Sequence, residues 1–153
     1  MTLTPNTLPL LSEADTAKFA EKIASIAKTG DTLLLEGPIG AGKSAFARAF
    51  IRARLGRMED VPSPTFTLVQ TYEDPNGDIW HCDLYRLTHP DEAFELGLDT
   101  AFDTAICLIE WPDRLGQYIP ENALHLSFSA GDTHHSVIIS APTAWADRIG
   151  HLL

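Results

Sequence analysis

Eight consecutive residues combine glycines, a lysine and a hydroxyl at a spacing that suits phosphate binding. Residues 37–44 read GPIGAGKS and match the pattern G-x-x-x-x-G-K-[ST] in full. The glycines let the backbone bend so that successive N–H groups point at phosphate oxygens, and a helix that begins at this point adds partial positive charge. In such a loop the lysine reaches the terminal phosphates and the hydroxyl is a ligand of Mg²⁺. We therefore interpret the segment as a phosphate-binding loop (P-loop) for a nucleoside triphosphate.

We expect the whole loop and the first residues of the following helix to contact the nucleotide. Lys43 has in addition a predicted catalytic role, and Ser44 has a predicted role as a metal ligand. The predicted nucleotide-binding residues are Gly37, Pro38, Ile39, Gly40, Ala41, Gly42, Lys43, Ser44 and Ala45.

Two acidic residues are candidates for catalysis and for metal binding, because Mg²⁺ at such a site usually takes one or two protein carboxylates. Glu110 follows the apolar run 106–109, where an acid emerges at the carboxyl edge of a sheet. Asp83 lies in the apolar segment 81–86, where an unpaired buried acid would be costly. The residues leave a structural reading open for each of them: a salt bridge from Asp83 to Arg86, and a capping role for Glu110.

Three other features carry weaker predictions. Thr65 follows Ser63 and Pro64, and its hydroxyl could approach the terminal phosphate and the metal, as switch loops do. Trp111 could stack on a base or a partner, although packing in the core explains it equally well. His134 and His135 are neighbours on a predicted strand and point to opposite faces, so we do not expect them to share a metal.

The elements that must hold these residues form a strand, a tight loop and a helix. Residues 32–35 are a short apolar run typical of a strand buried on both faces. A helix is predicted from about Lys43 to Leu55, with Gly56 as its stop. Before the strand, an amphipathic helix is predicted from an N-cap at Ser12 to Gly30. The P-loop motif therefore stands in the context that this chemistry requires.

The remainder of the chain predicts two hairpins and two further helices. The predicted segments are strands 65–72 and 79–85 around the turn 74–78, a short helix 90–96, a buried strand 105–110, a hairpin of 124–128 with 137–139, and a final helix from Thr143. The fold class is therefore α/β: a P-loop NTPase-like domain whose mixed sheet has a parallel core, antiparallel hairpins and flanking helices. We predict one domain over residues 1–153, with 1–11 and 141–153 at its periphery.

Charge restricts the ligands that the chain can hold by itself. The 11 basic and 21 acidic residues give a net charge of −10, which disfavours direct binding to nucleic acid or to an anionic membrane. The bias is uneven: residues 1–57 hold 8 basic and 5 acidic residues, a net of +3, whereas residues 58–153 hold 3 and 16, a net of −13. This asymmetry favours either a solvated basic helix or an anionic ligand near the P-loop helix.

Other sequence features indicate where the protein works. There is no apolar run long enough to span a bilayer and no basic leader before Lys18, so we expect a cytoplasmic protein. Cys82 and Cys107 form no CxxC pair and lie in apolar stretches, so we expect two buried, reduced thiols.

Five motifs, in their order and spacing, resemble the TsaE family of small bacterial P-loop ATPases, also called YjeE. Besides the P-loop they are SPTFTL at 63–68, HCDLYR at 81–86, ELGL at 95–98 and ICLIEWP at 106–112. The resemblance covers about residues 12–127, and the combination is far more specific than the P-loop alone. Ser44 stands where the family more often has threonine, and this change keeps the hydroxyl.

The resemblance implies a role in making N6-threonylcarbamoyladenosine at position 37 of tRNAs that read codons beginning with A. In the family, the protein binds ATP and Mg²⁺ and associates with a TsaB–TsaD heterodimer, which performs the carbamoyl transfer, while ATP hydrolysis resets the complex. Carried to this chain, it makes Asp83 and Glu110 the essential acids and Thr65 the switch hydroxyl. The tRNA would then be reached only through the partner complex, which agrees with the acidic net charge.

Two other functions remain open from the residues. A small metabolite kinase would use the same P-loop, but phosphoryl transfer generally needs several cations, and the second half of the chain has only Arg86, Arg114 and Arg148. A nucleotide-sensing interaction module would bind ATP without turning it over. Because no arginine accompanies the loop itself, we expect slow hydrolysis by the chain alone and stimulation by a partner.

Overall fold

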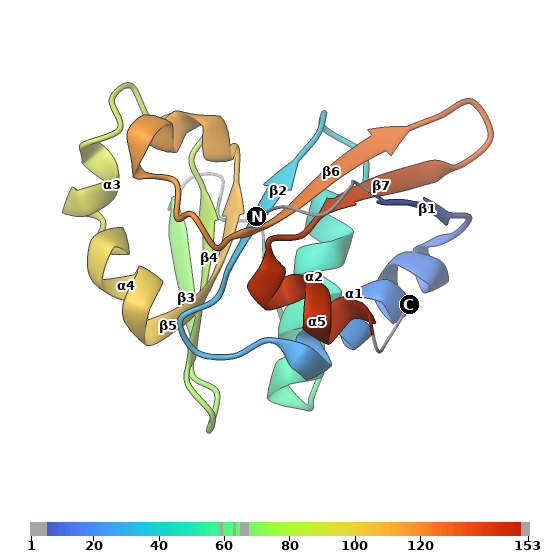
Figure 1. The fold of residues 1–153 in the computed structure, drawn as a ribbon, viewed down its shortest axis with the longest axis horizontal. Coiled ribbons are helices and arrows are strands. Elements are labelled where there is room, and N and C mark those ends of the chain that lie inside the picture. Colours follow the sequence, from blue (N-terminus) through green and yellow to red (C-terminus); the bar gives the residue numbers. More distant parts are fainter. Residues whose placement is uncertain (1–5, 59, 63, 65–67, 151–153) are drawn as a thin grey trace.

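The computed structural model describes residues 6–58, 60–62, 64 and 68–150. Its seven strands form one sheet in the order β1-β7-β6-β2-β5-β4-β3 (Figure 1). The strands are β1 (Asn6–Leu10), β2 (Thr32–Glu36), β3 (Val69–Tyr72), β4 (Asp78–Asp83), β5 (Ala105–Glu110), β6 (Leu124–Ala130) and β7 (His135–Ser140). The helices are α1 (Glu13–Ile26), α2 (Lys43–Leu55), α3 (Glu92–Glu95), α4 (Leu98–Thr104), α5 (Thr143–Gly150) and the 3₁₀ segment η1 (Pro112–Tyr118).

The centre of the sheet is parallel and its margins are antiparallel. β4, β5, β2 and β6 run parallel to one another, β3 pairs antiparallel with β4, and β7 pairs antiparallel with β6. Both predicted hairpins and the parallel core are therefore confirmed. The carboxyl ends of β2, β4 and β5 lie together at one edge of the sheet, which is where ligands of open α/β sheets bind.

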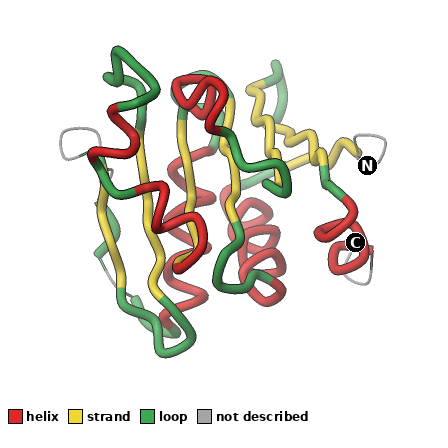
Figure 2. Tube along the Cα trace, turned by 60° about the vertical axis from the view of Figure 1, so that its left-hand side comes forward, coloured by secondary structure: helices red, strands yellow, loops and turns green. Residues whose placement is uncertain are grey.

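Helices cover both faces of this sheet, and the turned view in Figure 2 shows them in front of and behind the strands. α1, α2 and α5 pack on one face through residues such as Phe19, Phe46 and Trp145. α3, α4 and η1 cover the other face. Side chains alternate along a strand, so β2 sends Leu33 and Leu35 to the first layer and Leu34 to the second. This double burial explains the continuous apolar run of β2.

The helices that frame the P-loop begin and end close to where the sequence predicts. The Ser12 side chain caps α1 by accepting the backbone N–H of Asp15, which satisfies an otherwise unpaired donor of the first turn. α2 spans Lys43–Leu55 as predicted, and Gly56 ends it with a left-handed φ of 69°. α1 ends at Ile26, earlier than the predicted stop at Gly30.

Some elements differ from the prediction because contacts distant in sequence decide them. β1 was not predicted: its segment NTLPL contains Pro9, and it forms only because it pairs antiparallel with β7 at the margin of the sheet, where proline is tolerated. Leu10 of this strand is buried, and α5 buries Trp145, so both predicted peripheral segments contribute to the core. α4 and η1 were also not predicted, since they are short and depend on burying Leu98 and Leu115.

Two further observations bear on the sequence expectations. Cys82 and Cys107 are buried free thiols, as predicted. Within the described ranges, no helix is both long enough and apolar enough to cross a bilayer.

Candidate functional site

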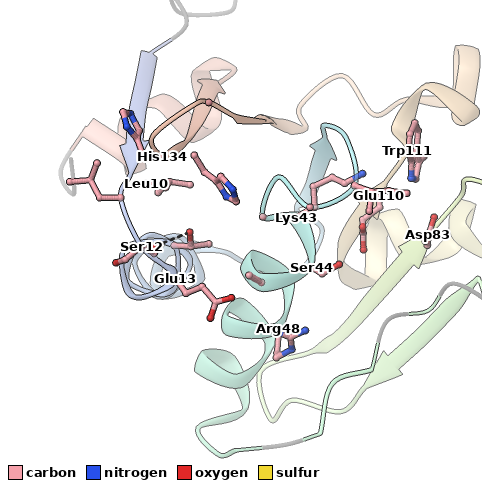
Figure 3. A pocket seen from close by; sticks show the side chains of 18 of the residues that line it. Leu10, Ser12, Glu13, Lys43, Ser44, Arg48, Asp83, Glu110, Trp111 and His134 are labelled. Atoms are coloured by element: carbon pink, nitrogen blue, oxygen red, sulfur yellow. Dashed lines mark hydrogen bonds between the residues drawn. The ribbon is translucent and has the colours of Figure 1, made fainter.

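A cleft of about 890 Å³ lies at the edge of the sheet where β2, β4 and β5 end. One wall is the P-loop with the start of α2, and the strand ends supply Asp83 and Glu110 (Figure 3). The opposite wall comes from the N-terminus of α1 and from the turn between β6 and β7. The cleft therefore brings together segments from both ends and the middle of the chain.

The P-loop backbone adopts conformations that favour glycine. Gly37, Gly40 and Gly42 have φ angles of 137°, 85° and 113°, in a region that residues with a side chain rarely occupy. Gly37 also lies against β6 so closely that a Cβ there would approach the Phe128 carbonyl oxygen to less than 3.0 Å. Gly42 is the N-cap of α2, so the free N–H groups of the first helical turn open into the cleft.

Most, but not all, of the predicted loop residues line the cleft. Those on its wall are Ile39, Gly40, Gly42, Lys43, Ser44 and Ala45. Gly37 and Pro38 are not part of the wall, and Ala41 is turned into the core and fully buried. Some residues of the P-loop therefore face the protein interior, whereas the others line the cleft.

Lys43 is held in place by burial and by a contact within the protein itself. Only 5% of the surface of Lys43 is exposed. Its ammonium nitrogen lies 4.4 Å from the centroid of the Trp111 ring, which is a cation–π contact. Trp111 has a left-handed φ of 59°, unusual for a bulky residue, and its ring lies 4.9 Å from that of Tyr85. Trp111 lines the cleft beside the lysine and also packs against the core cluster of the second layer, so the packing expected for it is confirmed, while stacking on a base or a partner stays a prediction.

The two predicted acids are neighbours in the sheet. Asp83 on β4 is in register with Glu110 on β5, and both line the cleft together with Ser44 (Figure 3). They are 8% and 4% exposed, and the Asp83 carboxylate accepts a hydrogen bond from the backbone N–H of Tyr85. The Glu110 carboxylate lies 2.7 Å from Nε2 of His81, a buried histidine on β4.

The cleft meets the chemical requirement for Mg²⁺ through oxygen donors. The Ser44 hydroxyl and the carboxylates of Asp83 and Glu110 are oxygen donors of the kind that this ion prefers, and these three residues would hold it. Across the described parts of the chain, no group of three or more His, Cys, Asp or Glu residues is arranged to hold a metal. Thr65, the predicted switch hydroxyl, lies outside the described residues.

Sequence reasoning missed several residues of the site. His81 is part of the HCDLYR motif, yet nothing local in the sequence indicates that it meets Glu110, 29 positions away. The second wall, formed by residues 10–13 and 131–135 with Thr16, was also missed, because it depends on β1 pairing with β7. His135 lies next to the loop: a Cβ at Gly42 would be 3.7 Å from its Nδ1.

Positive charge around the cleft comes from α2 and from the segment that follows β4. Lys43 and Arg48 of α2 line the cleft, so part of the basic charge of this helix faces the site, and Arg86 lines it as well. Arg54 has a different role: it donates to Asp74 and to two carbonyls at the end of α1, which ties α2 to its neighbour. The cleft thus combines backbone N–H groups and cations with two acids on one side.

Comparison with known proteins gives a consistent result. The family model described as "Threonylcarbamoyl adenosine biosynthesis protein TsaE" matches residues 10–137. The tRNA threonylcarbamoyladenosine biosynthesis protein TsaE of Rickettsia bellii (strain RML369-C) is 39% identical over 123 residues, covering 80% of this chain and 85% of that protein. The protein of the same name from Bacillus subtilis (strain 168) is 37% identical over 129 residues, covering 83% and 80%.

A solved structure is also similar over nearly its whole length. The crystal structure of YdiB from Bacillus subtilis superposes with a TM-score of 0.83 at 28% sequence identity, covering 99% of this chain and 95% of that one. Residues 37–44, 81–86 and 106–112 of this chain and its two hairpins therefore lie within the superposed region.

Proposed function

The chain belongs to the TsaE family, and from this membership we propose that it is an ATP-hydrolysing accessory protein of tRNA threonylcarbamoyladenosine biosynthesis. The relatives carry this pathway in their names, and the residues that line the cleft are of the kinds that an ATPase would use. The observation that carries the proposal is that Lys43 of the P-loop and two adjacent acids, Asp83 and Glu110, line one cleft.

Each of these groups has a chemical task in ATP hydrolysis. The backbone N–H groups at the start of α2 and the Lys43 ammonium bind the phosphates and offset the charge that develops on them. Ser44, Asp83 and Glu110 would hold Mg²⁺, directly or through water, and this ion would neutralise the β- and γ-phosphates when bound. An acid that is not a direct ligand is placed to orient the attacking water.

The size of the cleft supports a whole nucleotide as the ligand. Its second wall extends from the P-loop to Leu10, Leu11 and Ser12 on one side and to the β6–β7 turn on the other. Leu11 is 67% exposed, which gives this wall an apolar surface that a base could cover. We assign the adenosine end of ATP to this wall, because the acids and Ser44 occupy the opposite end.

The partner in the proposal is a TsaB–TsaD complex, which would bind the tRNA and carry out the transfer. A chain with a net charge of −10 is poorly suited to holding tRNA by itself. Turnover by the chain alone is proposed to be slow, and the complex would stimulate it by completing the site.

Replacing Lys43 tests the proposal. We expect Lys43→Ala to bind Mg-ATP about 10- to 100-fold more weakly, since a hydrogen bond to a charged group contributes roughly 1.5–3 kcal/mol. Binding is measured by calorimetry, hydrolysis with and without TsaB–TsaD, and modification in a reconstituted assay. Lys22→Ala, at an exposed position on α1 away from the cleft, is the control.

The same experiments separate the alternatives. A Lys43→Ala variant with full activity in the modification assay contradicts the proposal. Stoichiometric phosphorylation of a hydroxylated metabolite would favour a kinase, and ATP binding without turnover, even with the complex present, would favour a nucleotide sensor.

A further inference from the structure

Glu110 needs a partner because of where the fold places it. It is the last residue of β5, and only 4% of its surface is exposed, on a strand that is buried along its whole length. A carboxylate in such surroundings is unstable unless it is hydrogen-bonded. Its acidic neighbour in register, Asp83, would repel it and cannot serve that purpose.

His81 supplies the hydrogen bond. Its Nε2 lies 2.7 Å from Oε2 of Glu110, and the two side chains are 2% and 5% exposed. An ionised carboxylate only accepts hydrogen bonds, so Nε2 of His81 is the donor in this contact. His81 and Asp83 are two positions apart on β4, so their side chains share the face of the sheet on which Glu110 also lies.

The contact fixes one oxygen of Glu110 and leaves the other for the cleft. The contact of Oε2 with His81 restricts rotation of the carboxylate, and Oε1 is then the oxygen left to bind a metal or a water, since Glu110 lines the cleft. Building on the proposed ATPase function, we propose that His81 is a positioning residue that orients the Glu110 carboxylate for metal binding and hydrolysis.

Stability alone is a weak explanation for this pair. Replacing both partners of a buried hydrogen bond by apolar groups of the same shape can be nearly neutral or stabilising, so such a pair in a core is not by itself stabilising. Hydrogen bonds that orient a metal-binding side chain have a different effect: removing one typically lowers metal affinity or activity about 10- to 100-fold.

Two substitutions at His81 distinguish orientation from simple packing. In His81→Gln, the side-chain NH₂ lies the same number of bonds from Cα as Nε2 and can still donate to Glu110. His81→Leu fills a similar volume without a donor. We expect His81→Leu to lower kcat for ATP hydrolysis about 10- to 100-fold, to weaken the Mg²⁺-dependent part of ATP affinity, and to leave ATP affinity in EDTA unchanged. His81→Gln should retain most of the wild-type kcat and Mg²⁺-dependent ATP affinity.

A matched control is available on the same sheet. Nε2 of His125 lies 2.8 Å from the Glu36 carboxylate, and neither residue lines the cleft. His125→Leu therefore removes a histidine–glutamate contact without touching the site, and we expect it to leave kcat and Mg²⁺ dependence at wild-type values.

A double-mutant cycle tests whether His81 acts through Glu110. In a Glu110→Gln background, the further change His81→Leu should have no additional effect on kcat or on Mg²⁺ dependence. A loss by the same factor in both backgrounds would overturn the proposal, as would a folded His81→Gln variant as impaired as His81→Leu, or a His81→Leu variant with wild-type kinetics.

One readout does not depend on ATP turnover. The ¹⁵N spectrum of imidazole-labelled protein without nucleotide should report the Nε2–H form of His81, and Glu110→Gln should change that signal, whereas His125→Leu should not. The Nδ1–H form at His81 would contradict the inference. Absence of hydrolysis by the wild-type protein with its partner complex would instead contradict the proposed function, and the imidazole spectrum and the Mg²⁺ dependence of ATP binding would still decide the role of His81.

Discussion

Gly37 offers a sharp test of how the P-loop is built into the sheet. It follows β2 directly, with a φ of 137°, and a Cβ at this position would lie 3.1 Å from the Phe128 carbonyl carbon and closer still to its oxygen. Phe128 belongs to β6, which pairs with β2 through contacts such as Glu36 with Ser127. The added methyl group of Gly37→Ala therefore meets the backbone of Phe128, and β2 and β6 cannot move apart without breaking their pairing.

The magnitude follows from two separate costs. A residue with a side chain held in such a conformation costs about 1–3 kcal/mol. Forcing an extra carbon into a packed site typically costs a further 1–3 kcal/mol or so. Gly40→Ala has only the first cost, because a Cβ at Gly40, with φ of 85°, has nothing within 4 Å. We therefore expect Gly37→Ala to be less stable than Gly40→Ala by about 1–3 kcal/mol.

The free energy of unfolding of both variants and of the wild-type protein is measured by urea titration followed by far-UV circular dichroism, without nucleotide. Domains of this size are stable by roughly 5–15 kcal/mol, so both variants should still fold and can be compared directly. Equal stability of the two variants, or a more stable Gly37→Ala, would refute the contact between the loop and β6.

Three further predictions concern the scaffold around the cleft. Arg54→Ala removes hydrogen bonds to a buried carboxylate and to two carbonyls at the end of α1, and we expect urea titration to show a loss of about 2–4 kcal/mol; a loss within error of zero would contradict this role. Burial raises the pKa of the Cys107 thiol to about 12 and that of the Cys82 thiol well above its usual value. Neither thiol should therefore react with a disulfide reagent at about pH 8 until the protein is unfolded, and rapid labelling of the native protein would contradict this prediction. Hydrogen bonds from Thr88 lower the pKa of Glu92 below its ordinary 4.5. The wild type should therefore be more thermally stable than Glu92→Gln at neutral pH, and this difference should shrink as the pH falls through the lowered pKa. A difference that does not change with pH would contradict the shift.

The part of the site that local sequence determines was predictable. The apolar run of β2, the glycines of the loop and the start of α2 follow one another, so their geometry depends on neighbours in the chain. Gly56 is another case, because a left-handed stop at the end of α2 is a property that glycine confers locally. Asp83 and Glu110 could be predicted as a pair because both follow apolar strand segments, and parallel strands end at the same edge.

The rest of the site depends on contacts that no local pattern encodes. β1 joins the sheet only through β7, about 130 positions later, and its Pro9 weakens any strand signal. Without that pairing the start of α1 would not face the β6–β7 turn, and the second wall of the cleft would not exist. The contact between His81 and Glu110 could not be predicted from the sequence for the same reason, because the register between β4 and β5 follows from the packing of the whole sheet.

The position of Asp83 and Glu110 also restricts the kinds of ligand that the cleft can bind favourably. Like charges about 4 Å apart repel by roughly 4 kcal/mol at an effective dielectric constant near 20. Asp83 and Glu110 therefore oppose a bare phosphate or sulfate at the P-loop, and a site for such an anion would be better without them. A divalent cation between carboxylates and phosphates turns this repulsion into attraction. Two buried acids beside this loop are therefore more favourable when a divalent cation lies between them and an anionic ligand, which is why their pairing supports our proposal of Mg-ATP more strongly than the P-loop does alone.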